Sequence, residues 1–133
     1  MAGIESNLVT ARIASEAFTT QLVANGHTLV ADEPLALGGN NLGPTPGDYL
    51  RMALASCTAI TLRMYANRKQ WAMDAVHVEV NTSQADGVTL FTRNIELIGT
   101  LDDEQKKRLL QIANSCPVHK ALVGTIHITT ALR

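Results

Sequence analysis

The 133-residue sequence has few aromatic residues, only two cysteines, almost no net charge and no long apolar run. Its 11 basic and 12 acidic side chains leave a formal charge of −1, which does not provide the basic surface that nucleic acid or an anionic membrane attracts. The central uncharged run, residues 52–62, is much shorter than the roughly 20 residues that cross a bilayer. We therefore expect neither nucleic acid nor a membrane as a partner.

The two cysteines, Cys57 and Cys116, are too few for a secreted fold held together by disulfides. The N-terminal residues also lack the charged and then apolar pattern of a signal peptide. These absences predict a cytoplasmic protein with reduced thiols at rest. Because 46% of the residues are hydrophobic and 17% are charged, a disordered chain is excluded. The length suits a single domain, residues 1–133, that buries roughly two thirds of its unfolded surface.

Local patterns predict an α+β domain with antiparallel sheets. Asn25-Gly26 and Asp86-Gly87 each separate two alternating segments, which is a strong signal for a β-hairpin. The segment 32–47 is rich in proline and glycine and is expected to form a surface loop. The predicted elements, in order, are strands at 9–13, 18–23 and 27–30, a helix from 48 to about 68, strands at 76–81 and 88–98, helices from 101 and from 118, and a strand around 126–128.

The helix predicted from Asp48 has a marked start and an unusual composition. Thr45 can cap it, Pro46 suits its first position, and Asp48 stands three residues after Thr45 as in a capping box. Cys57 lies in the middle of its apolar stripe. Since residues 52–62 are apolar or small on every side, we expect protein to surround this helix, either as a central helix of the domain or at a dimer interface.

Three segments together resemble one known family. They are GPTPGDYLRMALASCTAITLRMYANRKQW from Gly43, LDDEQKKRLLQIANSCPVHKAL from Leu101, and the ADEP…GG loop that precedes the first of them. They resemble the osmotically inducible protein C (OsmC) family, which includes the organic hydroperoxide resistance (Ohr) proteins, over nearly the whole chain. The resemblance implies an intertwined homodimer in which antiparallel sheets pack around a long central helix that carries a cysteine, with sites made from both subunits.

The resemblance also implies a thiol chemistry without cofactor or metal. Cys57 matches the family's peroxidatic cysteine and Cys116 its resolving cysteine. An organic hydroperoxide would oxidise Cys57 to sulfenic acid, Cys116 would condense with it to a disulfide, and an external dithiol reductant would restore both thiols. A thiolate is the nucleophile in such chemistry, and a nearby second thiol traps the sulfenic acid before further oxidation.

Two family features are absent from this sequence. Gly47 stands where the hydroperoxide-reducing branches have a glutamate, and no arginine lies between Arg12 and Arg51, where the resemblance places the activating arginine. An arginine beside the sulfur lowers the pKa of a thiol because it favours the charged form. Without that pair, an apolar helix is expected to raise the pKa of Cys57 and to slow its attack.

Each candidate site residue also has a purely structural interpretation. Cys57 can be a packed core residue, and Cys116, which precedes a proline, can be a helix cap. Asp48, one residue after the missing glutamate, is a candidate carboxylate or simply part of the capping box. His119, three residues after Cys116, can pair with a thiolate or only pack. The paired C-x-x-C spacing of structural zinc sites is missing, so no metal is expected.

Three functions remain open from the sequence. The first is a homodimeric thiol peroxidase that reduces organic hydroperoxides through Cys57 and Cys116. The second is a homodimer that binds a lipid-like or aromatic small molecule, with Cys57 in the pocket wall. The third is a purely structural dimeric domain. The pKa of Cys57 separates the first two, since a value well below about 8.5 indicates an activated nucleophile.

Overall fold

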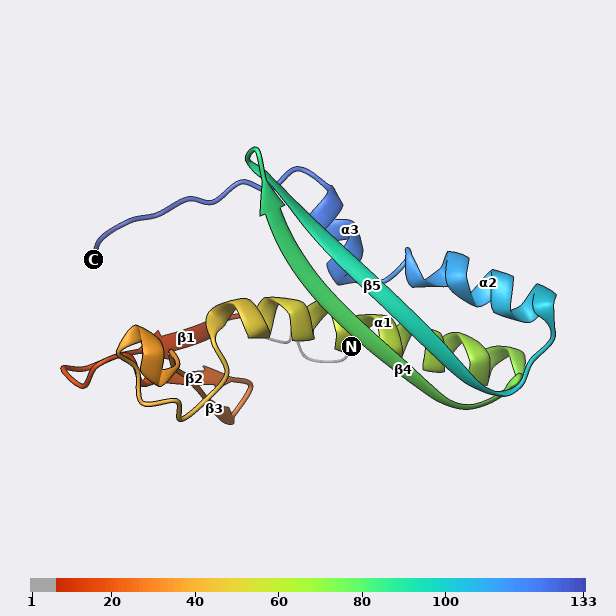
Figure 1. Cartoon of the computed structure of the whole chain (residues 1–133), viewed down its shortest axis with the longest axis horizontal. Helices are drawn as coiled ribbons and strands as arrows, with labels where there is room; N and C mark the ends of the chain where they lie inside the picture. The colour runs from red at the N-terminus through yellow and green to blue at the C-terminus, as the bar shows by residue number, and fades with distance from the viewer. Residues whose placement is uncertain (1–6) are drawn as a thin grey trace, which may run out of the picture. The chain divides into compact units, whose positions relative to one another are not determined.

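The computed structural model describes residues 7–133 and has the predicted α+β composition, with antiparallel pairing in its sheets (Figure 1). Contacts divide the chain into two compact units, one ending at Leu50 and the other comprising Arg51–Arg133. The elements, in order, are β1 (Val9–Arg12), β2 (Thr20–Ala24), β3 (His27–Ala31), the 3-10 turn η1 (Leu35–Leu37), α1 (Pro46–Lys69), β4 (Ala72–Ala85), β5 (Val88–Thr100), α2 (Asp103–Ala113) and α3 (Pro117–Val123).

The first unit contains the predicted antiparallel meander, with strands in the order β1-β2-β3. The turn between β2 and β3 consists of Asn25 and Gly26, whose φ angles are 49° and 79°. Both residues tolerate positive φ with little strain, which is why this dipeptide closes a two-residue hairpin. The hairpin prediction from the sequence is confirmed.

Asp32 organises the loop that follows β3. Its side chain is 2% exposed, and its carboxylate accepts a hydrogen bond from the Thr19 hydroxyl at 2.8 Å. It also accepts the backbone N–H groups of Glu33, Asn40 and Leu42 at 2.8, 3.3 and 3.3 Å. Burial alone raises the pKa of Asp32, but these four hydrogen bonds together lower it below its usual value. One ionised carboxylate therefore holds three backbone points of this loop together, in addition to the backbone hydrogen bonds within the loop.

Replacing Asp32 with asparagine is expected to lower the thermal stability of the protein at neutral pH. A depressed pKa in the folded state means that the carboxylate contributes stability above its unfolded pKa of about 3.9, and that this contribution is lost as the pH falls through the folded value. The melting temperature of Asp32→Asn should be lower than wild type at pH 7, and the difference should shrink in acid. Asp86→Asn is the matched control, since asparagine suits the positive φ of a turn residue. Equal melting of Asp32→Asn and wild type at pH 7 would refute this role.

The start of α1 confirms the predicted capping box. The Thr45 N–H donates to Asp48 Oδ2 at 3.0 Å, and the Asp48 N–H donates to Thr45 Oγ1 at 3.1 Å. Each side chain thus satisfies a backbone donor that the first helical turn leaves free.

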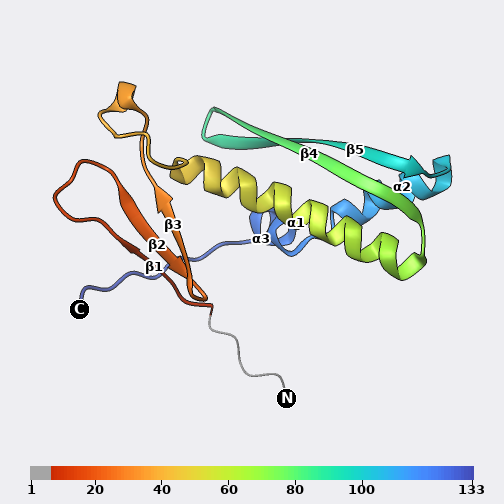
Figure 2. The ribbon, with the colours of Figure 1, turned by 90° about the horizontal axis from the view of Figure 1, so that it is seen from below.

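The second unit is built on the long β4–β5 hairpin, which lies along α1 and α2 (Figures 1 and 2). Its turn at Asp86 and Gly87 has φ angles of 53° and 76°, as expected for this dipeptide. Apolar side chains of the hairpin alternate toward the helices and pack against the buried cluster, whose members are Leu62, Tyr65, Ala66, Met73, Leu109 and Ala113. This cluster joins α1, α2 and the hairpin into one core.

Helices α2 and α3 are separated by a short break. Asp102 caps α2 in a capping box with Gln105, and α2 ends at Ala113. Cys116 is the N-cap of α3, and Pro117 is its first residue, as the proline predicted. Cys116 therefore lies between the two helices.

One expectation from the sequence is corrected, and a second is narrowed to one of its two alternatives. The strand predicted around Ile126 and Ile128 is absent, since residues 125–133 have no regular secondary structure. Alternating apolar residues form a strand only when a neighbouring strand takes up their backbone hydrogen bonds, and neither described sheet does so. Of the two settings expected for α1, a central helix covered by this chain alone is not found, because Met52, Ile60 and Met64 are 43%, 55% and 66% exposed, and a dimer interface stays a prediction.

Within residues 7–133, no helix combines the length and the apolar character needed to span a bilayer.

Candidate two-thiol site

The structure brings Cys57 and Cys116 together within the second unit. Cys57 is partly buried on α1, and Cys116 is fully buried at the start of α3. Both are free thiols, and each shifts the pKa of the other, as neighbouring thiols do. Two neighbouring thiols can pass reversibly to a disulfide, so this arrangement has the parts that a dithiol redox centre needs.

The sulfur of Cys116 is surrounded by hydrogen-bond donors. The backbone N–H of His119 donates to Sγ at 3.2 Å, and the Thr58 hydroxyl lies 4.0 Å from it. Burial alone raises the pKa of Cys116, but these donors, together with Cys57 and the Val118 N–H, lower it below the usual value for a thiol. The Cys116 environment therefore favours the thiolate.

The pKa of Cys57 is shifted in the opposite direction, above the usual value for a thiol. Burial is the main cause that raises the pKa of Cys57, and the neighbouring Cys116 raises it further, while hydrogen bonds from the Val118 N–H and from Thr61 lower it only in part. This is the direction that the missing family arginine and glutamate predicted. Since two adjacent thiols share one charge more easily than they carry two, the opposite directions of the two pKa shifts mean that Cys116 is the thiol of the pair that loses its proton first.

Thr58 links the thiols to a cation. Its side chain is fully buried on α1, one residue after Cys57, and its hydroxyl donates to the Leu54 carbonyl at 2.7 Å. The same oxygen accepts a hydrogen bond from Arg93 Nη1 at 3.0 Å. The hydroxyl thus lies between the guanidinium of Arg93 and the sulfur of Cys116.

Arg93 is a site residue that the sequence analysis missed. It extends from β5, and besides Thr58 its guanidinium donates to Ala113 O at 3.3 Å, to Asn114 Oδ1 at 3.0 Å and to His119 Nδ1 at 3.2 Å. One signal could have identified it, because Arg93 occupies the half-buried face of an alternating strand, a position where a charge needs partners.

His119 has a defined tautomer in this site. A guanidinium can only donate, so Nδ1 of His119 is the acceptor, and the proton of the neutral imidazole lies on Nε2. Burial and the positive charge of Arg93 both lower the pKa of His119, which keeps the ring neutral at physiological pH. The structure places this predicted residue beside Cys116, as the backbone hydrogen bond shows.

The structure does not place Asp48 among the residues around the two thiols. It belongs to the first unit, and its carboxylate accepts the N–H of Thr45 in the cap of α1. A catalytic role for Asp48 stays a prediction. For a metal, the described part of the chain offers no group of three or more histidine, cysteine or carboxylate side chains that converge.

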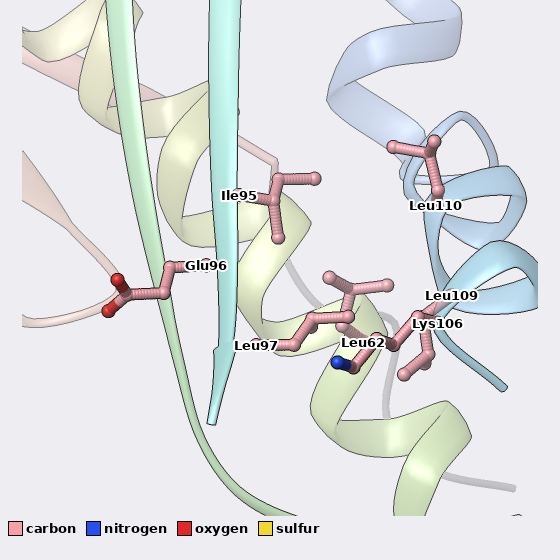
Figure 3. A pocket seen from close by; sticks show the side chains of 7 residues that line it. All are labelled: Leu62, Ile95, Glu96, Leu97, Lys106, Leu109 and Leu110. Carbon is pink, nitrogen blue, oxygen red and sulfur yellow. The ribbon is translucent and has the colours of Figure 1, made fainter. Parts of the chain in front are cut away.

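An apolar pocket of about 400 Å³ lies between β5 and the helices of the second unit (Figure 3). Its lining residues are Leu62, Ile95, Glu96, Leu97, Lys106, Leu109 and Leu110. In Figure 3, Ile95 and Leu97 point toward the leucines of the helices, and the carboxylate of Glu96 points away from them. A pocket of this size and lining suits part of a small apolar molecule.

The pocket continues along the same faces that form the thiol site. Leu62 lies one helical turn after Thr58 on α1, and residues four apart share one face of a helix. Ile95 lies two residues after Arg93 on β5, and residues two apart share one face of a strand. The apolar wall of the pocket therefore begins at Leu62 on α1 and at Ile95 on β5, next to Thr58 and Arg93 on the same faces.

The fold and the site define an α+β protein with a paired-thiol centre. The sequence matches the OsmC family, described as OsmC-like protein, over residues 38–131. The chain belongs to the OsmC family. Among curated proteins, none matches it in sequence.

Solved structures show the same fold at low sequence identity. An OsmC-like protein from Mycoplasma pneumoniae is 17% identical with a TM-score of 0.78, over 91% of this chain and 89% of that one. The organic hydroperoxide resistance protein OsmC from Legionella pneumophila is 17% identical with a TM-score of 0.65, over 91% of each chain. An organic hydroperoxide resistance protein from Elizabethkingia anophelis is 16% identical with a TM-score of 0.66, over 93% of this chain and 92% of that one.

Proposed function

We propose that the protein is a thiol-dependent reductase of organic hydroperoxides that cycles Cys57 and Cys116 between dithiol and disulfide. The observation that carries the proposal is that two free thiols are neighbours in the second unit, where each shifts the pKa of the other. Membership of the OsmC family supports the redox class. The names of the Legionella and Elizabethkingia proteins, whose folds are similar, support hydroperoxides as the oxidant.

The exposure of the two sulfurs suggests their roles. Cys57 is partly exposed, whereas Cys116 is fully buried, so an incoming peroxide meets Cys57 first. Cys57 is therefore the nucleophile of the proposal and becomes a sulfenic acid. Cys116 then condenses with that sulfenic acid, and an external dithiol reduces the disulfide. The thiols carry the electrons, so the cycle uses no cofactor.

The apolar pocket favours an organic over an inorganic peroxide. Its walls consist mainly of leucine and isoleucine side chains, and two of them lie one helical turn after Thr58 on α1 and two residues after Arg93 on β5. An alkyl or aryl group of a hydroperoxide can bury apolar surface there, which contributes about 25 cal/mol per Å² of buried area, and hydrogen peroxide has no such group. The preference for organic substrates would thus arise from binding and not from the chemistry of the sulfur.

A homodimer completes the proposal. Met52, Ile60 and Met64 are apolar and exposed, and because they are four, eight and twelve residues apart, they lie within about a third of the circumference of α1. A second copy that covers this face would remove it from water, in the manner that the family resemblance implies. A reducing compartment such as the cytoplasm would supply the dithiol reductant.

The pocket also supports a second candidate function. A homodimer with a closed apolar pocket can bind a lipid-like or aromatic molecule without any redox cycle, and the raised pKa of Cys57 favours this alternative. In that case Cys57 would be a wall residue.

Turnover with a dithiol reductant tests the proposal against this alternative. The reduced protein should consume cumene hydroperoxide continuously in the presence of dihydrolipoamide, and at least about tenfold faster than hydrogen peroxide, because binding an apolar group of about 60 Å² is worth a factor of this size. Replacing the exposed pocket residue Leu110 with glutamate should slow the organic substrate and leave the hydrogen peroxide rate unchanged. Absence of turnover, together with tight binding of an apolar fluorescent probe, would replace the proposal with the binding function.

A further inference from the structure

We propose that Arg93 is the positioning residue of the thiol pair, which holds Thr58 and His119 against Cys116 so that the negative charge of the pair lies on Cys116 and the proton on Cys57. It would thereby supply the positive charge that this sequence lacks between Arg12 and Arg51. The inference rests on the proposed function only where it assigns the charge a role in hydroperoxide reduction.

The partners of Arg93 are all uncharged. Its guanidinium donates to the hydroxyl of Thr58, the carbonyl of Ala113, the side-chain oxygen of Asn114 and the neutral ring of His119. Among residues 7–133, no carboxylate forms an ion pair with it. A partly buried cation without a counter-ion stabilises an anion placed nearby, and the thiol pair is the ionisable group next to its partners.

These contacts join every element around Cys116. Thr58 belongs to α1, Ala113 to the end of α2, Asn114 to the break that follows α2, and His119 to α3, while Arg93 itself comes from β5. A single side chain thus contacts two of the residues that donate to the Cys116 sulfur, Thr58 and His119. In this cluster the side chains of Cys57, Cys116 and His119 titrate, and the positive charge of Arg93 reaches Cys116 through Thr58 and His119.

The hydroxyl of Thr58 can serve both redox states. It has one proton and two acceptors within reach, the Leu54 carbonyl at 2.7 Å and the Cys116 sulfur at 4.0 Å. Because Arg93 donates to the oxygen, the proton is directed toward one of these two acceptors. It can turn to the sulfur when Cys116 is a thiolate and stay on the carbonyl when Cys116 is part of a disulfide.

A thiolate at Cys116 would act as the base for Cys57. The Cys57 thiol gives its proton to Cys116, and its sulfur attacks the terminal oxygen of the hydroperoxide. The O–O bond breaks, and the alkoxide that leaves takes a proton from water, which gives an alcohol and the Cys57 sulfenic acid. Cys116 then loses its proton to solvent and displaces hydroxide, which leaves as water. In sum, two thiols are oxidised to a disulfide, and one hydroperoxide is reduced to an alcohol and water.

A thiolate titration in the absence of peroxide tests the inference. In Cys57→Ser, the ultraviolet absorbance of the remaining thiolate reports the pKa of Cys116, which should lie below the free-cysteine value of about 8.5. Arg93→Gln in that background should raise the midpoint by about one pH unit or more, which is a tenfold change in the ionisation equilibrium. Arg93→Lys should retain part of the wild-type value because it keeps the charge.

Arg63→Gln is the matched control. Arg63 is also held by neutral groups, Asn67 and the carbonyls of Met73 and Asp74, and it has no contact with either thiol. An equal shift with Arg63→Gln, or no shift with Arg93→Gln, would overturn the inference.

Thr58→Val provides a second test if Arg93→Gln fails to fold. It removes the hydroxyl that links Arg93 to Cys116 and preserves the shape of the side chain, so the midpoint should rise, and an unchanged midpoint would overturn the inference. No peroxide is used in these titrations, so an unchanged midpoint would overturn the role of Arg93 and leave the proposed disulfide cycle standing. Conversely, if the disulfide cycle proves wrong, the titration result for Arg93 is unaffected.

Discussion

Replacing Cys57 with serine is expected to lower the rate of dithiol-dependent hydroperoxide reduction on the order of a thousandfold or more. Serine keeps the size of the side chain, but its hydroxyl is a poor nucleophile toward the peroxide bond and cannot form the disulfide with Cys116. The loss should appear in kcat as well as in kcat/KM, because the change removes the reacting atom and leaves the binding walls intact. Steady-state consumption of cumene hydroperoxide measures both.

Cys116→Ser separates the roles of the two sulfurs. In that variant Cys57 can still react once, so the expected product is a protein that gains one oxygen and no disulfide, and then turns over poorly with a dithiol reductant. Because Cys116 is proposed as the base as well as the resolving thiol, its first reaction should also be slower than in wild type. If Cys57→Ser and wild type consume the hydroperoxide at equal rates, Cys57 is not the nucleophile.

Gly99→Ala is expected to be the most destabilising single change in the β4–β5 hairpin. Gly99 has a φ of 146°, and a Cβ built on it would lie 2.1 Å from the Ala72 carbonyl oxygen and 2.9 Å from the Asp74 nitrogen. These are backbone atoms that cannot move aside, and Met73 between them is part of the buried core. The positive φ costs about 1–3 kcal/mol, and the steric overlap adds about as much, so the free energy of unfolding should fall by about 2–6 kcal/mol.

Gly87→Ala is the control for the backbone angle alone. Gly87 also has a positive φ, of 76°, but a Cβ at this position meets no heavy atom within 4 Å. Its unfolding free energy should therefore fall by only about 1–2 kcal/mol, the cost of a left-handed residue with a side chain. Chemical denaturation by urea measures both variants, and similar losses for Gly99→Ala and Gly87→Ala would show that the close approach to Ala72 is not what holds this end of the hairpin.

The elements that the sequence predicts well depend on contacts between near neighbours. Asn25-Gly26 and Asp86-Gly87 close their hairpins because each pair itself tolerates positive φ, and Thr45 with Asp48 starts α1 through hydrogen bonds three residues apart. The OsmC resemblance likewise depends on residues that can be read along the chain. These features therefore need no knowledge of tertiary packing.

The features that escaped prediction depend on distant residues. Arg93 is 35 residues from Thr58 and 26 from His119, so its role becomes visible only when β5, α1 and α3 are placed together. The loop fixed by Asp32 depends in part on Thr19, 13 residues earlier. The strand predicted at 126–128 also depends on a distant residue segment. An alternating pattern does not show whether a partner strand is present, and no partner strand pairs with this segment in the described sheets.

The central claim is that Cys57 and Cys116 form a disulfide when an organic hydroperoxide oxidises them. Intact mass and free-thiol counting on the reduced protein, before and after one equivalent of cumene hydroperoxide, test it most directly, with hydrogen peroxide in parallel. The account predicts the loss of two hydrogens and of both thiols, faster with the organic peroxide, and reversal by a dithiol. Persistence of both thiols over minutes at millimolar peroxide would contradict it.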